Sequence, residues 1–169
     1  LIRNPMHKII KSLLLMLFFS VHITAQHTNL EKASTLFSEA KYSAAQALFQ
    51  QVIINDGADE NAHYHNARCS KELFASDAIF LYEQFLMDFP FTSFKDEVSE
   101  DLALLYYRGL DYPKVINYFL KLKNLEDYPH LIFKLAYANF SIDSLVDAQY
   151  YFSKLINTES KYAATAQYY

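Results

Sequence analysis

The chain has 169 residues, which is enough for one domain with a substantial core. It holds 2 Gly, 4 Pro and no Trp beside 14 Tyr and 14 Phe, and this scarcity of turn-forming residues favours long helices over many short strands. The formal net charge is -4, and Lys and Arg are not clustered, so nucleic acid is not an expected partner. A single cysteine, Cys69, excludes an intrachain disulfide framework.

Residues 1–25 have the order of a secretory signal peptide. A basic start around Lys8 is followed by an apolar run over 13–21 and by the small residue Ala25. The run is shorter than the roughly 20 apolar residues that a membrane span requires. We therefore expect cleavage after Ala25, export to the periplasm or the periplasmic face of the outer membrane, and no membrane span afterwards; a retained anchor is the alternative.

A pattern repeats four times in the rest of the chain. In each copy a small or β-branched residue is followed four positions later by an aromatic residue and three positions after that by a bulky apolar one. The four trios are Ala45, Phe49, Val52; Ala78, Tyr82, Phe85; Val115, Phe119, Leu122; and Ala148, Phe152, Leu155. This spacing places each trio on one helical face, and the trios are 33, 37 and 33 residues apart.

Twelve residues before each trio lies a position at which a partner helix should approach closely, occupied by Ala33, Asn66, Ala103 and Ala136. Polar residues and prolines then bound the helices: Ser43 and Ser93 are expected caps, and Pro113 suits a first turn. The predicted helices cover 29–40, 44–55, 60–74, 77–89, 94–108, 113–124, 129–140 and 145–156, with another starting at 161.

The four trios and their near-34-residue period resemble the tetratricopeptide repeat family, and the resemblance covers Leu30 to Tyr169. It implies an all-α fold, an α-solenoid of about four helix-turn-helix repeats plus the start of a further helix. The first helices lack the Trp and Gly usual in that family, and the 37-residue step implies one longer loop. The expected domain is 26–169, with repeats near 26–58, 59–92, 93–127 and 128–160 and a next repeat starting at 161–169.

A narrower likeness concerns Phe85 to Tyr107. Phe89-Pro90 and the new helix that follows are similar to long periplasmic tetratricopeptide arrays of bacterial envelopes, including outer-membrane assembly lipoproteins. The resemblance implies a location in the cell envelope.

No motif for catalysis or for a cofactor is found. His65 and Cys69 share a helical face while His63 points elsewhere, and two ligands do not make a zinc site, so we expect no metal. The acidic pairs lie in predicted first helical turns, where the helix dipole accounts for them. Gly57 and Gly109 are isolated, so there is no phosphate-binding loop. The protein is not expected to be an enzyme.

The function expected is therefore non-enzymatic: a scaffold that binds a partner protein or peptide in a concave groove. By the resemblance, the groove is lined by first-helix residues, namely Tyr64, Arg68, Lys71, Glu100, Tyr107, Arg108, Phe133 and Tyr137. Each of these can equally be a packing or a solvated side chain. The alternatives are a structural spacer in a longer array and a component of outer-membrane protein assembly or transport.

Overall fold

The computed structural model describes residues 29–156 and 158–169, and within these ranges the chain is helical and contains no β-strand. The all-α prediction is confirmed. The expected signal peptide, 1–25, lies outside the described residues. The chain divides into two compact units, the first ending at Phe85 and the second running from Leu86 to Tyr169.

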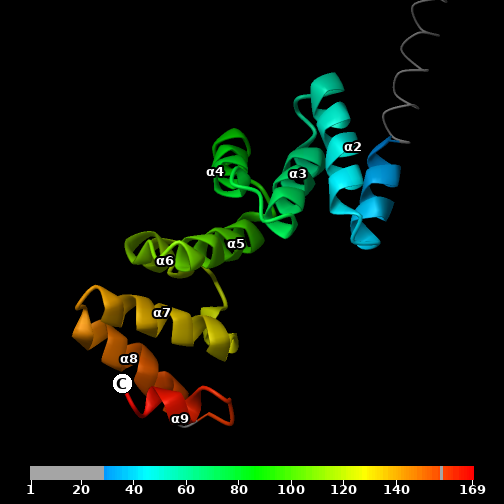
Figure 1. The fold of residues 1–169 in the computed structure, drawn as a ribbon. Coiled ribbons are helices and arrows are strands. Elements are labelled where there is room, and N and C mark those ends of the chain that lie inside the picture. The colour runs from blue at the N-terminus through cyan, green and yellow to red at the C-terminus, as the bar shows by residue number, and fades with distance from the viewer. Residues whose placement is uncertain (1–28, 157) are drawn as a thin grey trace, which may run out of the picture. The chain divides into compact units, whose positions relative to one another are not determined.

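Unit 1 is a set of helices, drawn in Figure 1, that pack around a small core. Its elements are a helix over 29–38, α2 (Tyr42–Asn55), α3 (Glu60–Glu72) and the greater part of α4 (Ala78–Asp88). The core consists of Ala33, Ala45, Phe49, Val52, Ala62 and Cys69. On the other side of α3, the ring of Tyr64 lies 5.8 Å from that of Phe85 on α4.

Unit 2 is a run of helices in which each packs on the next along the chain. The elements are α5 (Lys95–Arg108), α6 (Tyr112–Phe119), the short 3-10 helix η1 (Leu125–Asp127), α7 (Pro129–Ser141), α8 (Leu145–Ile156) and α9 (Ala163–Ala166). The pairs α5–α6 and α7–α8 are helix hairpins, and α6 joins them by packing against α7.

The repeat pattern matches the burial of the side chains. Every member of the four trios is buried except Leu122, which is half-buried. The four close-approach positions are also buried, and at one of them the Oδ1 of Asn66 has no hydrogen-bond partner among the described residues, which is costly in a core. The trios therefore supply the interior that a single helix pair lacks.

The turn inside each helix pair is also repeated, although its residues differ. Ala40, Phe74, Leu110 and Asp143 all have φ between 54° and 61°, the left-handed region. In each case the next residue donates its N–H to the carbonyl five positions earlier, for example Lys41 to Leu36 at 2.9 Å. This is the Schellman arrangement that ends many helices, here built without glycine at the left-handed position.

The structure corrects three local predictions. Helix α6 ends at Phe119 instead of 124, because the following N–H groups bond three residues back and the chain turns to bury Leu125. Ser43 lies inside α2, whose N-cap is Lys41. Ser93 does not cap α5, which begins after Phe94 without a side-chain cap.

Candidate functional site

The predicted groove residues of unit 2 lie on matching faces of its two first helices. On α5, Glu100 and Tyr107 are seven residues apart and therefore share a face. On α7, Phe133 and Tyr137 are four apart and share a face as well. The rings of Tyr107 and Tyr137 are 6.3 Å apart, so the two faces meet at that end.

A continuous group of aromatic rings extends from the C-terminal end of α5 along α7 to α8 and the residues after it. We name it the aromatic cluster; it comprises Tyr107, Tyr112, Phe133, Tyr137, Phe140, Phe152, Tyr162 and Tyr169. Tyr107, Tyr112 and Tyr137 form a triangle with centroid separations of 6.1, 6.2 and 6.3 Å, mostly edge to face. Tyr169 stacks on Phe152 at 5.0 Å. Such contacts fix the rings as a preorganised surface.

Within the described part of the chain, two cations lie on this cluster, and one of them is Lys161, whose Nζ is 5.3 Å from the centroid of the Tyr162 ring. The Nζ of Lys134 is 4.9 Å from the centroid of the Tyr107 ring, within range of a cation–π contact. Burial, and secondarily the neighbouring Tyr112, Tyr137 and Tyr169, raise the pKa of Tyr107. Its hydroxyl therefore stays protonated at neutral pH and can donate or accept a hydrogen bond.

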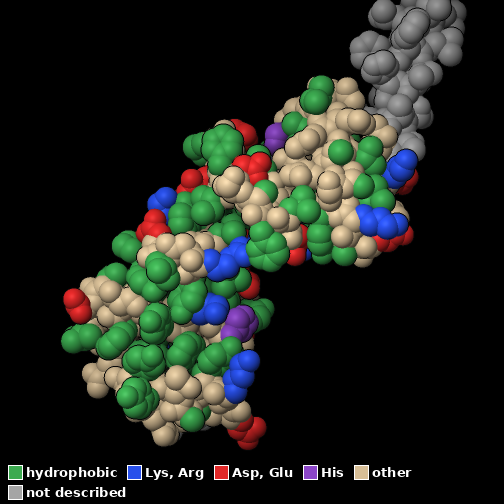
Figure 2. Space-filling model, in the orientation of Figure 1, with side chains coloured by type: hydrophobic (Ala, Val, Ile, Leu, Met, Phe, Trp, Pro, Cys, Tyr) green, Lys and Arg blue, Asp and Glu red, His purple; other side chains and the backbone are tan. Residues whose placement is uncertain are grey.

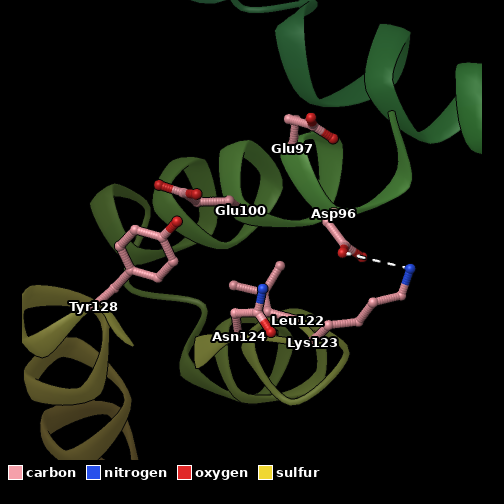
Figure 3. Close-up of a pocket in the computed structure, with 7 residues that line it drawn as sticks. All are labelled: Asp96, Glu97, Glu100, Leu122, Lys123, Asn124 and Tyr128. Atoms are coloured by element: carbon pink, nitrogen blue, oxygen red, sulfur yellow. Dashed lines mark ion pairs between the residues drawn. The ribbon is translucent and has the colours of Figure 1, made fainter. Parts of the chain in front are cut away.

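An acidic pocket lies at the other end of the same helices (Figure 3). It has a volume of about 170 Å³ and is lined by Asp96, Glu97, Glu100, Leu122, Lys123, Asn124 and Tyr128. Lys123 pairs with Asp96 at 3.8 Å, whereas Glu97 and Glu100 have no ion pair among the described residues. In Figure 3, Glu100 and Tyr128 extend toward each other. The pocket thus has more negative than positive charge.

The other predicted groove residues belong neither to the aromatic cluster nor to the acidic pocket. Arg108 is exposed at the end of α5. In unit 1, Tyr64 is only 5% exposed and is a packing residue, and the Arg68 guanidinium lies 4.8 Å from the Phe37 ring. Lys71 pairs with the adjacent Glu72 at 3.2 Å. Of the eight predicted residues, Tyr107, Phe133 and Tyr137 therefore belong to the aromatic cluster, and Glu100 lines the acidic pocket.

Unit 1 contains two groups considered for metal binding in the sequence. His65 is half-buried; its ring stacks on Phe49 at 5.3 Å, and its Nδ1 has no hydrogen-bond partner. Desolvation, and secondarily Arg68, lower the pKa of His65. Burial raises the pKa of the Cys69 thiol to about 11, so it is protonated at neutral pH. No group of three or more candidate metal ligands occurs among the described residues.

Sequence reasoning missed several members of the aromatic cluster. Phe140 and Tyr169 have no fixed place in the repeat spacing, and their mutual contact depends on how the chain turns after α8. Tyr112 lies three residues before Val115, but its contact with Tyr137 depends on the packing of α6 against α7. Lys134 was missed as well, although it lies three positions, or about one helical turn, before the predicted groove residue Tyr137. That spacing could have indicated a cation beside the groove.

Comparison with known proteins identifies the fold. No protein-family model matches the sequence, and no curated protein matches it. Two solved structures of MamA are similar. "MamA AMB-1" has a TM-score of 0.69 and 22% identity over 80% of this chain and 74% of that chain. A mutant of MamA has a TM-score of 0.69 and 21% identity over 85% and 84%.

These neighbours are tetratricopeptide-repeat solenoid proteins, so the chain has a tetratricopeptide-like fold. None of the helices within 29–156 and 158–169 has both the length and the apolar character that crossing a bilayer requires. The fold with its paired first helices, together with the aromatic cluster and the acidic pocket, is the basis for a functional proposal.

Proposed function

We propose that the protein is a non-enzymatic scaffold that holds a segment of a partner protein along the faces of α5 and α7. One observation carries this proposal: the acidic pocket and the aromatic cluster lie at the two ends of the same pair of helices. The pocket joins Glu100 of α5 to Tyr128 just before α7, and the cluster joins Tyr107 to Tyr137. We refer to this surface, from the acidic pocket to the aromatic cluster, as the α5–α7 face.

The chemistry of the two ends defines the partner. Glu97 and Glu100 suit a basic side chain, and the aromatic cluster suits an apolar or aromatic one. Glu100 and Tyr107 are seven residues apart on α5, or about 10 Å along the axis. An extended peptide covers that distance in about three residues. The partner segment should therefore carry a basic residue and a large apolar residue about three positions apart.

The test is affinity purification of the full chain with partners from its own organism. Loss of a stoichiometric partner in a Tyr107→Ala, Tyr137→Ala variant supports capture by this face. The matched control is Tyr150→Ala with Phe80→Ala, because both aromatic side chains are exposed outside the aromatic cluster. If no stoichiometric partner is recovered with the unaltered chain, the protein is a spacer in a longer array.

We further propose that the scaffold works in the bacterial cell envelope. The support is the basic, apolar and small-residue order of 1–25. Cell fractionation and N-terminal sequencing test this: the expected product begins at Gln26 and is found outside the inner membrane. Full-length protein in the cytoplasm would contradict it.

A role in outer-membrane protein assembly or transport remains a second candidate, favoured by Phe89-Pro90 and the helix that follows. Depletion of the protein should then lower the levels of outer-membrane proteins, and unchanged levels would count against it.

A further inference from the structure

A second pocket of unit 2 lies on a different side of α5 from the acidic pocket. It has a volume of about 490 Å³ and is lined by Leu86, Pro90, Lys95, Ser99, Tyr118 and Lys121. Lys95 and Ser99 are four residues apart on one face of α5, whereas Asp96 and Glu100 occupy another. Helix α5 therefore separates a pocket with lysines from a pocket with carboxylates. We name the former the basic pocket.

Tyr118 lines the basic pocket and stacks on Tyr106 behind it, and a lysine lies on each of these two rings. The Nζ of Lys121 lies 4.7 Å from the ring of Tyr118, which stacks on Tyr106 at a centroid distance of 5.8 Å. At the far side of this pair, the Nζ of Lys114 lies 4.4 Å from the Tyr106 ring and donates a hydrogen bond to its hydroxyl at 2.9 Å. The two tyrosines are thus held rigidly between lysines.

The positive charge of the pocket is not neutralised within the described part of the chain. No acidic side chain lines the pocket, and neither Lys95 nor Lys121 has an ion pair there. Lys95 is the first residue of α5, and the two acidic residues of the same turn, Asp96 and Glu97, line the acidic pocket instead. An anionic group from another molecule would pair with the lysines that line the basic pocket.

We propose that the basic pocket docks an acidic segment of a partner protein. Two carboxylates would pair with Lys95 and Lys121, and an apolar side chain between them would pack on Leu86, Pro90 and Tyr118. Charge complementarity supports this occupant. A volume of about 490 Å³ suits one or two side chains.

The same observations disfavour larger polyanions. A segment that binds an anionic membrane carries about four to eight clustered Lys and Arg, and two lysines line this pocket. The chain as a whole has a net charge of -4, which repels a nucleic acid. The acidic segment is also chemically opposite to the basic segment proposed for the α5–α7 face, so the two surfaces hold different sequences.

The experiment measures fluorescence anisotropy of a short labelled peptide that carries glutamates on both sides of a phenylalanine. The unaltered chain should bind it, and Lys95→Gln with Lys121→Gln should weaken binding by about tenfold. The matched control, Lys32→Gln with Lys41→Gln, removes the same charge from exposed positions of unit 1 and should bind like the unaltered chain. Lys121→Arg should retain binding, because the charge is kept.

Three results would overturn the proposal. The first is equal weakening by both double variants, which would indicate a general charge effect. The second is equal binding of a peptide with glutamines in place of the glutamates. The third is binding to vesicles containing phosphatidylserine without binding to the peptide. Circular dichroism of each variant confirms that the exposed substitutions leave the helices intact.

Discussion

Single residues in the turns of this protein are under backbone strain that glycine would relieve. A residue other than glycine in the left-handed region costs about 1–2 kcal/mol, and four helix ends place such a residue there. These turns could not be predicted from the sequence, because glycine, the usual residue at the left-handed position, is absent there. The four positions are occupied by Ala40, Phe74, Leu110 and Asp143.

Ala40→Gly should therefore stabilise the protein. Relief of the left-handed strain outweighs the greater chain entropy of glycine in the unfolded state, leaving a gain of up to about 1 kcal/mol in the free energy of unfolding. Urea denaturation measures the change. Ala44→Gly is the control, since Ala44 is also exposed but lies inside α2, and it should lose about 1 kcal/mol. A loss at both positions would show that residue 40 is unstrained.

His65 should make unit 1 less stable in acid. Its pKa is lowered in the folded state by desolvation and by Arg68, so the unfolded chain binds the proton more readily. The contribution of His65 to stability is then fully present above pH 6.5, the ordinary pKa of histidine, and falls as the pH drops below it. His65→Phe keeps an aromatic ring against Phe49 and removes the proton site.

The measurement is the urea midpoint at several pH values between neutral and mildly acidic. The unaltered chain should lose more stability on acidification than the His65→Phe variant. Parallel pH profiles of the two proteins would show that His65 does not carry the effect.

At the level of the elements, the repeated trio is the feature that stabilises the helix pairs. The start of every α-helix over 29–156 was predicted to within two residues, because buried positions recur with helical spacing, whereas the 3-10 helix η1 was not predicted. The end of α6 could not be predicted, since it depends on burying Leu125 after a turn, a tertiary contact that leaves no periodic signal.

Phe119→Ala tests the trio of α6 directly. Phe119 is fully buried, so its truncation should cost about 3–5 kcal/mol through lost transfer energy and a cavity. Leu120→Ala is the neighbouring control, because Leu120 is 57% exposed, and should cost less than about 1 kcal/mol. Thermal denaturation followed by circular dichroism compares the two. Similar losses would mean that α6 does not present its trio face to the core.

The candidate site was predicted in part, and physical reasons set that limit. The resemblance to the tetratricopeptide repeat family implies a groove lined by the first helices, and it therefore predicts Glu100, Tyr107, Phe133 and Tyr137 on α5 and α7. It cannot predict which of the eight groove residues stay accessible to a partner. Tyr64, for example, is buried and its ring packs against Phe85. It also cannot predict partners such as Lys134, whose position depends on packing between helices.

At the scale of the whole molecule, hydrophobic side chains remain on the surface of unit 2. Figure 2 shows them gathered over α7 and α8, and the exposed members there include Phe140, Leu145, Val146 and Tyr150. Apolar side chains exposed in this number are typical of proteins that contact other proteins. A scaffold function therefore accounts for features of unit 2 that a monomer with no partner would not require.

Capture by the α5–α7 face is the central claim, and site-specific photo-crosslinking tests it most directly. A photoreactive phenylalanine analogue replaces Asn124, an uncharged and exposed residue of the acidic pocket, or Ser153, which is exposed on α8. Irradiation of cells should yield one strong adduct from position 124, and that adduct should be absent from position 153. No adduct from position 124, or the same adduct from both positions, would contradict the claim.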